Sequence, residues 1–183
     1  MIEPASACEA ECALHKARFP DVNHLTAEQL QRMLANGPVT LVDVRADAEQ
    51  QVSMLPDAVP LKHVQWPLPN DAPPIVLYCT VGYRSALEAR RLASQAPAAG
   101  IYSMEGILPW AHSGGSLVDP SSGAPTKRLH AFGSKWAAMS PADHRVETFD
   151  RVLSCPFLTA VLRVPVIWVL AAIAPDRGKK KEK

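Results

Sequence analysis

The sequence predicts an α/β domain with a central, mainly parallel β-sheet flanked by helices on both faces. Short runs rich in β-branched residues recur between residues 39 and 103, and they are too short for helices and typical of buried strands. Segments with helical periodicity separate these runs. Strands that alternate with helices are the pattern of a parallel sheet connected by helical crossovers.

The first predicted helix of this domain begins at a capping box. Thr26 is a suitable cap, and Gln29 stands three residues later, where its side chain can reach back to the cap. Residues of the apolar stripe follow at i, i+3 and i+7: Ala27, Leu30 and Leu34. The helix is expected to stop at residues 36–38, which read Asn-Gly-Pro.

Four segments are predicted as strands: 39–44, 58–61, 75–78 and 101–103. The third of them ends directly at Cys79. A helix is expected to begin near residues 83–85, because buried-type residues recur at i, i+4, i+7 and i+11 from Ser85. A short helix is expected over residues 107–112.

Changes of composition divide the chain into four parts. Residues 1–20 show no strong periodicity and are predicted to be a poorly ordered N-terminal segment. The domain itself is predicted over residues 21–118, because Gly, Ser and Pro accumulate from residue 114 to residue 125. Residues 119–154 form a C-terminal extension, and residues 155–183 form an apolar tail with a basic end.

Composition limits the classes of partner. Charged residues make up 20% of the chain and the net charge is +1, so no basic field suggests nucleic-acid binding. The N-terminus has neither a basic start nor an apolar stretch, and the four cysteines form no small secreted framework. We therefore expect a cytoplasmic or cytoplasm-facing protein.

The C-terminal tail leaves two interpretations open. Residues 155–174 have the length of a bilayer span, but they include Arg163 and two prolines. The segment either packs on its own domain or a partner, or associates with a membrane. Residues 176–183 carry a net charge of +3, from five basic and two acidic groups, which suits anionic headgroups in the second case.

The segment 75–85 carries the chemistry. It reads as a strand, a tight loop and the start of a helix, which is where α/β proteins place ligands. Gly82 allows a sharp turn, so that successive N–H groups can form a nest for an anion. The nest and the helix N-terminus both favour the thiolate over the thiol at Cys79.

Residues 79–85, Cys-Thr-Val-Gly-Tyr-Arg-Ser, resemble the active loop of single-domain rhodaneses. Asp43-Val44-Arg45 is similar to the first signature of that family, and residues 49–58 are similar to the second. Gly106 to Trp110, followed by two glycines, resembles the closing element. The resemblance covers residues 25–118. It departs at residues 53–54, where the family usually has Gly-His and this chain has Ser-Met.

The resemblance implies a rhodanese-like fold and sulfurtransferase activity without cofactor or metal. The Cys79 thiolate would attack a small sulfur donor such as thiosulfate, hold a persulfide, and pass the sulfane sulfur to a thiol or cyanide. Arg84 would pair with an anionic donor, and Asp43 and Arg45 would be a structural pair. The residues implied in substrate binding are Thr80, Val81, Gly82, Tyr83, Arg84 and Ser85.

Two other functions stay open. A non-catalytic binding or sulfur-sensing module usually lacks the cysteine that this chain keeps. Related phosphatases and arsenate reductases place five residues between Cys and Arg, whereas this chain has four between Cys79 and Arg84. The N-terminal Cys8 and Cys12, with His15, are either free thiols in a poorly ordered segment or a group that binds metal or resolves a persulfide.

Overall fold

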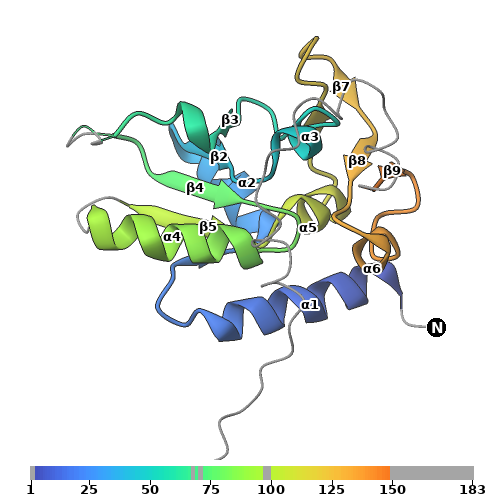
Figure 1. Cartoon of the computed structure of the whole chain (residues 1–183), viewed down its shortest axis with the longest axis horizontal. Coiled ribbons are helices and arrows are strands. Elements are labelled where there is room, and N and C mark those ends of the chain that lie inside the picture. Colours follow the sequence, from blue (N-terminus) through green and yellow to red (C-terminus); the bar gives the residue numbers. More distant parts are fainter. Residues whose placement is uncertain (1–2, 67–68, 70–71, 97–99, 149–183) are drawn as a thin grey trace, which may run out of the picture.

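A computed structural model describes residues 3–66, 69, 72–96 and 100–148. Its centre is a five-stranded, wholly parallel sheet with the strand order β1-β5-β4-β2-β3 (Figure 1). The strands are β1 (His24–Leu25), β2 (Thr40–Asp43), β3 (Val59–Pro60), β4 (Ile75–Tyr78) and β5 (Ile101–Met104). The predicted fold class is therefore confirmed. Strand β1 was not anticipated, because two residues carry no readable alternation.

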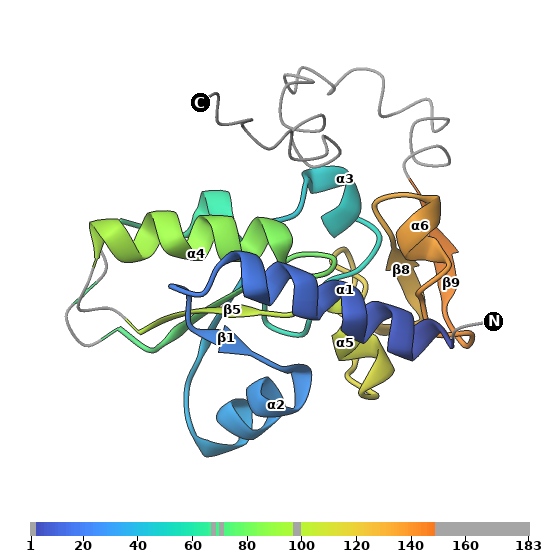
Figure 2. The ribbon, with the colours of Figure 1, turned by 90° about the horizontal axis from the view of Figure 1, so that it is seen from below.

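Strand β4 lies at the centre of the sheet and is buried on both faces. Val76 and Tyr78 face a cluster that includes residues of α2 (Ala27–Asn36) and α5 (Ile107–His112). Ile75 and Leu77 face the opposite cluster, which includes residues of α4 (Tyr83–Gln95). Figure 2 shows α4 and α2 on opposite sides of the sheet. Successive side chains of a strand point to opposite faces, so one short strand anchors both layers.

Helix α2 begins as predicted. The backbone N–H of Thr26 donates to Gln29 Oε1 at 2.7 Å, and the Gln29 N–H donates back to Thr26 Oγ1 at 3.2 Å. These reciprocal bonds satisfy donors that a helix N-terminus leaves unpaired. Two further short helices, α3 (Asp47–Gln50) and the 3₁₀ turn Leu61–His63, follow β2 and β3.

The N-terminal segment differs from the expectation of poor order. Residues Pro4–Arg18 form helix α1, with Pro4 in its first turn, where the missing N–H of a proline costs nothing. Cys8 and Cys12 are buried and belong to the same cluster as Leu30 and Trp110. The helix packs against α4 and α5, so it belongs to the core of the domain.

The described part of the C-terminal extension also packs on the domain. Its elements are β6 (Leu117–Val118), β7 (Pro125–Thr126), β8 (Arg128–His130), α6 (Ser134–Ala137) and β9 (Arg145–Glu147). Strands β8 and β9 pair in parallel, and Leu129 is fully buried in the cluster that holds Leu30. In Figure 1 the extension lies at the end of the molecule toward which β4 points.

The predictions for residues 155–174 fall outside the described residues. Among the residues that the structure describes, no helix is both long and apolar enough to cross a membrane.

Candidate active site

The loop after β4 has the predicted strand–loop–helix geometry. Strand β4 ends at Tyr78, Gly82 has a φ of 89°, and α4 begins at Tyr83. A positive φ of this size favours glycine, because a Cβ strains the backbone there. Cys79 is 1% exposed at the start of the loop. Its Sγ lies 3.6 Å from Oγ of Ser85, which is a hydrogen-bonding distance for sulfur.

The loop is held from the opposite side by the turn between β5 and α5. The Ile107 N–H donates to the Cys79 carbonyl at 2.8 Å, and the Leu108 N–H donates to the Thr80 carbonyl at 3.2 Å. Gly106 has a φ of 126°, and a Cβ there would collide with the Thr80 carbonyl. The backbone of residues 79–81 is therefore fixed by a second, close-packed backbone segment.

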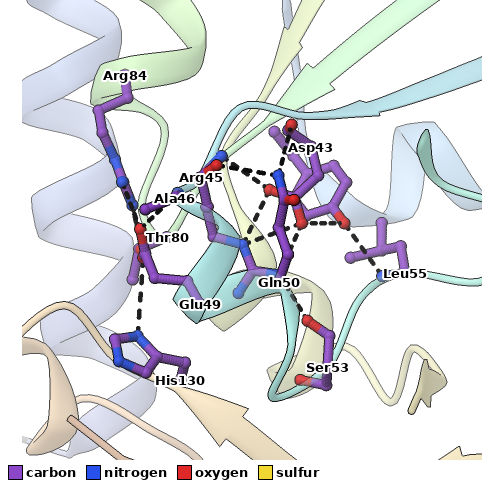
Figure 3. A network of polar contacts seen from close by, with 11 residues as sticks. Asp43, Arg45, Ala46, Glu49, Gln50, Ser53, Leu55, Thr80, Arg84 and His130 are labelled. Atoms are coloured by element: carbon purple, nitrogen blue, oxygen red, sulfur yellow. Dashed lines mark hydrogen bonds and ion pairs between the residues drawn. The ribbon is translucent and has the colours of Figure 1, made fainter. Parts of the chain in front are cut away.

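Arg84 does not point to an open anion site in this structure. Its Nη1 and Nη2 donate to the two carboxylate oxygens of Glu49 at 2.6 and 2.8 Å, and Nη2 also donates to Thr80 Oγ1 at 3.0 Å (Figure 3). The carboxylate accepts hydrogen bonds from the Nη1–Nη2 edge of the guanidinium. This bidentate arrangement is the strong form of the interaction. Arg84 is therefore paired internally in this structure, and its pairing with an anionic donor stays a prediction.

Glu49 is fully buried and nevertheless charged. Burial alone would raise the pKa of its carboxyl, but the Arg84 guanidinium and its hydrogen bonds outweigh burial and hold that pKa well below its ordinary range. The local charge of the pair is therefore close to zero beside the loop.

The C-terminal extension contributes two residues to this side of the site. His130 on β8 is fully buried, and its Nδ1 lies 3.7 Å from Glu49 Oε1. The Arg84 guanidinium carbon lies 5.2 Å from the centroid of the Phe132 ring, a cation–π distance. Local sequence rules do not reveal either contact, because both join segments that are far apart in the chain. The local signal that could have drawn attention to this segment is a histidine between apolar residues at 129–132.

Asp43 and Arg45 form a second ion pair, next to the first one in space (Figure 3). Arg45 Nη2 donates to Asp43 Oδ2 at 2.7 Å and to the Ser53 carbonyl at 2.6 Å. The Tyr78 hydroxyl donates to Asp43 Oδ2 at 2.7 Å, and Gln50 Nε2 donates to the Arg45 carbonyl at 2.9 Å. The structure therefore places this pair in the supporting network, in contact with the strand that leads to Cys79.

Helix α1 covers the loop from outside. The ring centroids of His15 and Phe19 lie 5.3 and 5.4 Å from that of Tyr83, in edge-to-face arrangements. Arg18 adds a cation–π contact to the same ring at 5.6 Å. Tyr83, one of the residues expected to bind substrate, thus lies under α1. The Cys12 thiol donates to the Glu105 carbonyl at 3.7 Å, in the turn that abuts the loop.

The remaining predicted site residues lie together in this loop. Thr80, Val81 and Ser85 are buried, and Val81 packs into the apolar cluster that contains Cys12. Its side chain supports the loop, so only its backbone is available to a bound anion. Within the described part of the chain, no three His, Cys, Asp or Glu side chains are grouped so that they could hold a metal ion.

Comparison with known proteins agrees with this geometry. Residues 26–111 match the rhodanese-like domain. A protein of Allochromatium vinosum named sulfurtransferase is 33% identical over 107 residues, which span 54% of this chain and 97% of that protein.

The chain belongs to the rhodanese-like family. Among solved structures, the thiosulfate sulfurtransferase of Pseudomonas aeruginosa matches with a TM-score of 0.51 and 18% identity, over 75% of this chain and 27% of that one. At this identity the match shows the rhodanese fold alone. A rhodanese-related protein of Thermoplasma volcanium matches with a TM-score of 0.46 and 22% identity, over 53% of this chain and 98% of that one.

Proposed function

We propose that this rhodanese-like protein is a sulfurtransferase that carries sulfane sulfur as a persulfide on Cys79. The observation that supports it most is the position of Cys79, between a buried strand and the first turn of α4, with Ser85 Oγ 3.6 Å from Sγ. Backbone N–H groups at a helix N-terminus stabilise negative charge. A thiolate and a persulfide anion are both charges of that kind.

The proposed reaction has two halves. The Cys79 thiolate attacks the outer sulfur of a donor such as thiosulfate; the S–S bond of the donor breaks, and sulfite leaves with the electron pair. A thiol or cyanide then attacks the outer sulfur of the persulfide and regenerates the thiolate. Covalent catalysis of this kind divides one difficult transfer into two easier ones.

The Glu49–Arg84 pair favours an anion-binding role for the loop backbone. Because the Arg84 charge is already balanced by a carboxylate at 2.6 and 2.8 Å, it adds little net field at the sulfur. The N–H groups of the loop and the first turn of α4 remain as the donors for the persulfide anion. In this proposal Arg84 orients the loop through Thr80 and Glu49.

Access to Cys79 requires a movement of its cover. The residue is 1% exposed, and α1 covers the neighbouring Tyr83. We propose that the donor enters when α1 shifts away from α4, and that the closed arrangement excludes water from the persulfide.

Mass spectrometry of the intact protein after treatment with thiosulfate tests the proposal. One added sulfur, about 32 Da, is expected on Cys79, together with release of sulfite. Cys79→Ser is expected to lose both the adduct and thiocyanate formation. Cys155→Ser, a cysteine outside the described residues, serves as the matched control and is expected to retain both. An unchanged rate of thiocyanate formation in Cys79→Ser would refute the proposal.

The four-residue spacing between Cys79 and Arg84 favours sulfur transfer over phosphate chemistry, and the internal pairing of Arg84 supports the same choice. An oxyanion such as phosphate needs the guanidinium that Glu49 occupies. Hydrolysis of an aryl phosphate is therefore expected to be negligible. Phosphatase activity that depends on Cys79 and exceeds sulfur transfer would reverse the assignment.

We also propose that residues 155–174 associate with a membrane, on the strength of their apolar composition and the basic residues 179–183. In a flotation assay with anionic vesicles, the full-length protein is expected to rise with the vesicles to the light fraction. A truncation after Asp150 is expected to stay in the dense fraction. Recovery of the full-length protein in the dense fraction, without detergent, would contradict this.

A further inference from the structure

Strand β8 of the C-terminal extension is buried on both of its faces. Leu129 and His130 are both fully buried, although successive residues of a strand point to opposite faces. Leu129 packs into the core cluster that contains Leu30, whereas the His130 ring faces Glu49 (Figure 3). The strand therefore joins the extension to the core with one face and to the candidate active site with the other.

The Glu49 carboxylate joins the active loop to two other segments of the chain. Its Oε2 accepts hydrogen bonds from Arg84 Nη1 at 2.6 Å and from the backbone N–H of Ala46 at 2.9 Å. Its Oε1 accepts from Arg84 Nη2 at 2.8 Å and from Thr80 Oγ1 at 3.4 Å, and His130 Nδ1 lies 3.7 Å from the same oxygen. A shift of this carboxylate would therefore disturb the active loop and the first turn of α4 together.

The extension contacts both members of the ion pair that supports the loop. His130 Nδ1 faces the Glu49 carboxylate, and the centroid of the Phe132 ring lies 5.2 Å from the guanidinium carbon of Arg84. His130 and Phe132 both follow residue 111, where the match to the rhodanese-like domain ends. The pair is thus contacted by a segment that lies outside the matched domain.

The charge of Glu49 fixes what the His130 ring must present to it. Burial would raise the pKa of the Glu49 carboxyl, but the Arg84 guanidinium, and then contacts with His130 and Arg45, hold that pKa well below its ordinary range. An ionised carboxylate only accepts hydrogen bonds, so the Nδ1 atom that faces it must carry a proton. A buried ring of this kind costs free energy unless its polar atoms have such partners.

We propose that His130 is a positioning residue of the sulfur-transfer site, which acts on the active loop through Glu49 and makes the C-terminal extension part of that site. The inference rests on the proposed function of Cys79 and adds a role for a segment outside the matched domain. In this proposal His130 contacts neither the donor nor the sulfur. It holds the carboxylate that orients Arg84, so that the N–H groups of the loop stay directed at Cys79.

Two substitutions of His130 separate the polar contact from packing. His130→Leu keeps an apolar side chain in the buried space and loses the contact with Glu49. It is expected to release sulfite from saturating thiosulfate roughly fivefold more slowly per folded molecule, with the half-saturating concentration changed less than about twofold, because the interaction matters mainly in the transition state. In His130→Asn the amide nitrogen can take the place of Nδ1 and donate to the carboxylate, so most of the parental rate should return.

His144→Leu is the matched control, because it removes another histidine of the same extension. The His144 side chain is 3% exposed, and its Nδ1 lies 2.8 Å from Oδ1 of Asp143, whose side chain is 64% exposed. This variant is expected to lose stability but to keep the parental rate per folded molecule. Urea unfolding gives the folded fraction of each variant, so a loss of stability is not counted as a loss of activity.

Combination of His130→Leu with Glu49→Gln tests the route of the effect. If His130 acts through Glu49, the double variant should be no slower than Glu49→Gln alone, for which a loss of roughly tenfold is expected, because the two residues belong to one network. Independent effects would multiply to a loss of roughly fiftyfold. That result would overturn the inference.

The parent protein offers a test that does not depend on the folding of any variant. Proton–nitrogen correlation spectra of histidine rings show which ring nitrogen carries a proton. The Nδ1 atom of His130 is expected to be protonated at neutral pH, because it faces an ionised carboxylate. An Nδ1 without a proton could not donate to Glu49 and would overturn the inference.

The inference and the proposed function fail in different ways. A parental rate of sulfite release in His130→Leu would end the role of His130 and leave the persulfide on Cys79 standing. Equal slowing in His130→Leu and His144→Leu would assign the loss to a general loosening of the extension and would also end that role. Absence of sulfite release from the parent protein would overturn the proposed function of Cys79 and, with it, the inference.

Discussion

Two buried carboxylate–guanidinium pairs lie side by side below the active loop, and they differ in what they connect. Asp43 and Arg45 are two residues apart, and both side chains are fully buried. Glu49 and Arg84 are 35 residues apart; Glu49 is fully buried, whereas the Arg84 side chain is 30% exposed. Both pairs are close, at 2.7 and 2.6 Å.

This difference in position suggests different roles for the two ion pairs. The Asp43–Arg45 pair is expected to be structural, and the Glu49–Arg84 pair is expected to affect the chemistry as well. The first pair fixes the turn after β2 and is completed by the Ser53 carbonyl and the Tyr78 hydroxyl. The second pair joins α3 to the first turn of α4, beside Cys79. Removal of one member should therefore cost mainly stability in the first case, and stability together with sulfur transfer in the second.

Asp43→Asn is expected to have the largest effect on stability. It leaves the Arg45 guanidinium buried without a counter-charge, which typically costs about 3–5 kcal/mol. Urea unfolding measures the loss, and the rate of sulfur transfer per folded molecule should stay close to that of the parent. Asp47→Asn, which removes the exposed pair with Lys62, is the matched control and should cost below about 1 kcal/mol. Equal losses in the two variants would contradict the role of Asp43.

Glu49→Gln is expected to cost less stability, about 2–3 kcal/mol, because the partly exposed Arg84 can turn toward water. Its sulfur-transfer rate should fall roughly tenfold, since the guanidinium no longer holds Thr80 and the start of α4 in one position. Glu88→Gln removes a surface pair from the same helix and serves as the control. A normal rate in Glu49→Gln would mean that both ion pairs are purely structural.

The pH dependence of the free energy of unfolding should differ between the parent protein and Glu49→Gln under acidic conditions. The folded-state pKa of Glu49 is depressed, so its stabilisation is complete above the unfolded pKa of about 4.3 and is lost as pH falls below it. One such group contributes a slope of at most about 1.4 kcal/mol per pH unit. Urea unfolding at several values between pH 5 and pH 3 should show a shallower slope in the variant. Parallel slopes would show that Glu49 is not the group responsible.

Among the three substitutions Asp43→Asn, Glu49→Gln and Tyr78→Phe, the last is expected to lower the free energy of unfolding least. It removes a hydrogen bond to Asp43 and leaves the Leu55 N–H, 3.2 Å from the phenol oxygen, without that partner. The cost should be about 1–2 kcal/mol, measured by urea unfolding, with sulfur transfer unchanged. Slower sulfur transfer in Tyr78→Phe would link Tyr78 to the active site. It would also mean that the network of Asp43 and Arg45 is not purely structural.

The part of the fold with regular periodicity was predictable from the sequence. The capping box at Thr26, the end of β4 and the start of α4 at Tyr83 all follow local rules, and the structure has them as predicted. These features depend on residues that are neighbours in the chain. The position of Cys79 between strand and helix belongs to the same class.

The cover of the site was not predictable in the same way. The buried face of helix α1 contains two cysteines, which do not stand out as an apolar stripe in the sequence. Leu14 is exposed on the same helix, although a leucine in an amphipathic helix usually faces the core. Strands of two or three residues, such as β6 and β8, are too short to show alternation. The contacts of His130 with Glu49 and of Lys135 with Glu11 depend on where the chain returns after more than 80 residues, which no local rule describes.

Gly106 lets the turn after β5 pack directly against the active loop, and this packing limits the length of the loop between Cys79 and Arg84. The missing side chain of Gly106 lets the Thr80 carbonyl and the Val81 nitrogen, which would stand 2.7 Å from a Cβ, pack directly against the turn after β5. An inserted residue between Cys79 and Arg84 would displace this backbone and break the bonds to Ile107 and Leu108. Engineering of the wider loop that surrounds a phosphate would therefore require a second, simultaneous redesign at residues 105–108. A single insertion in the loop alone is therefore expected to disturb the packing of residues 79–81 against this turn.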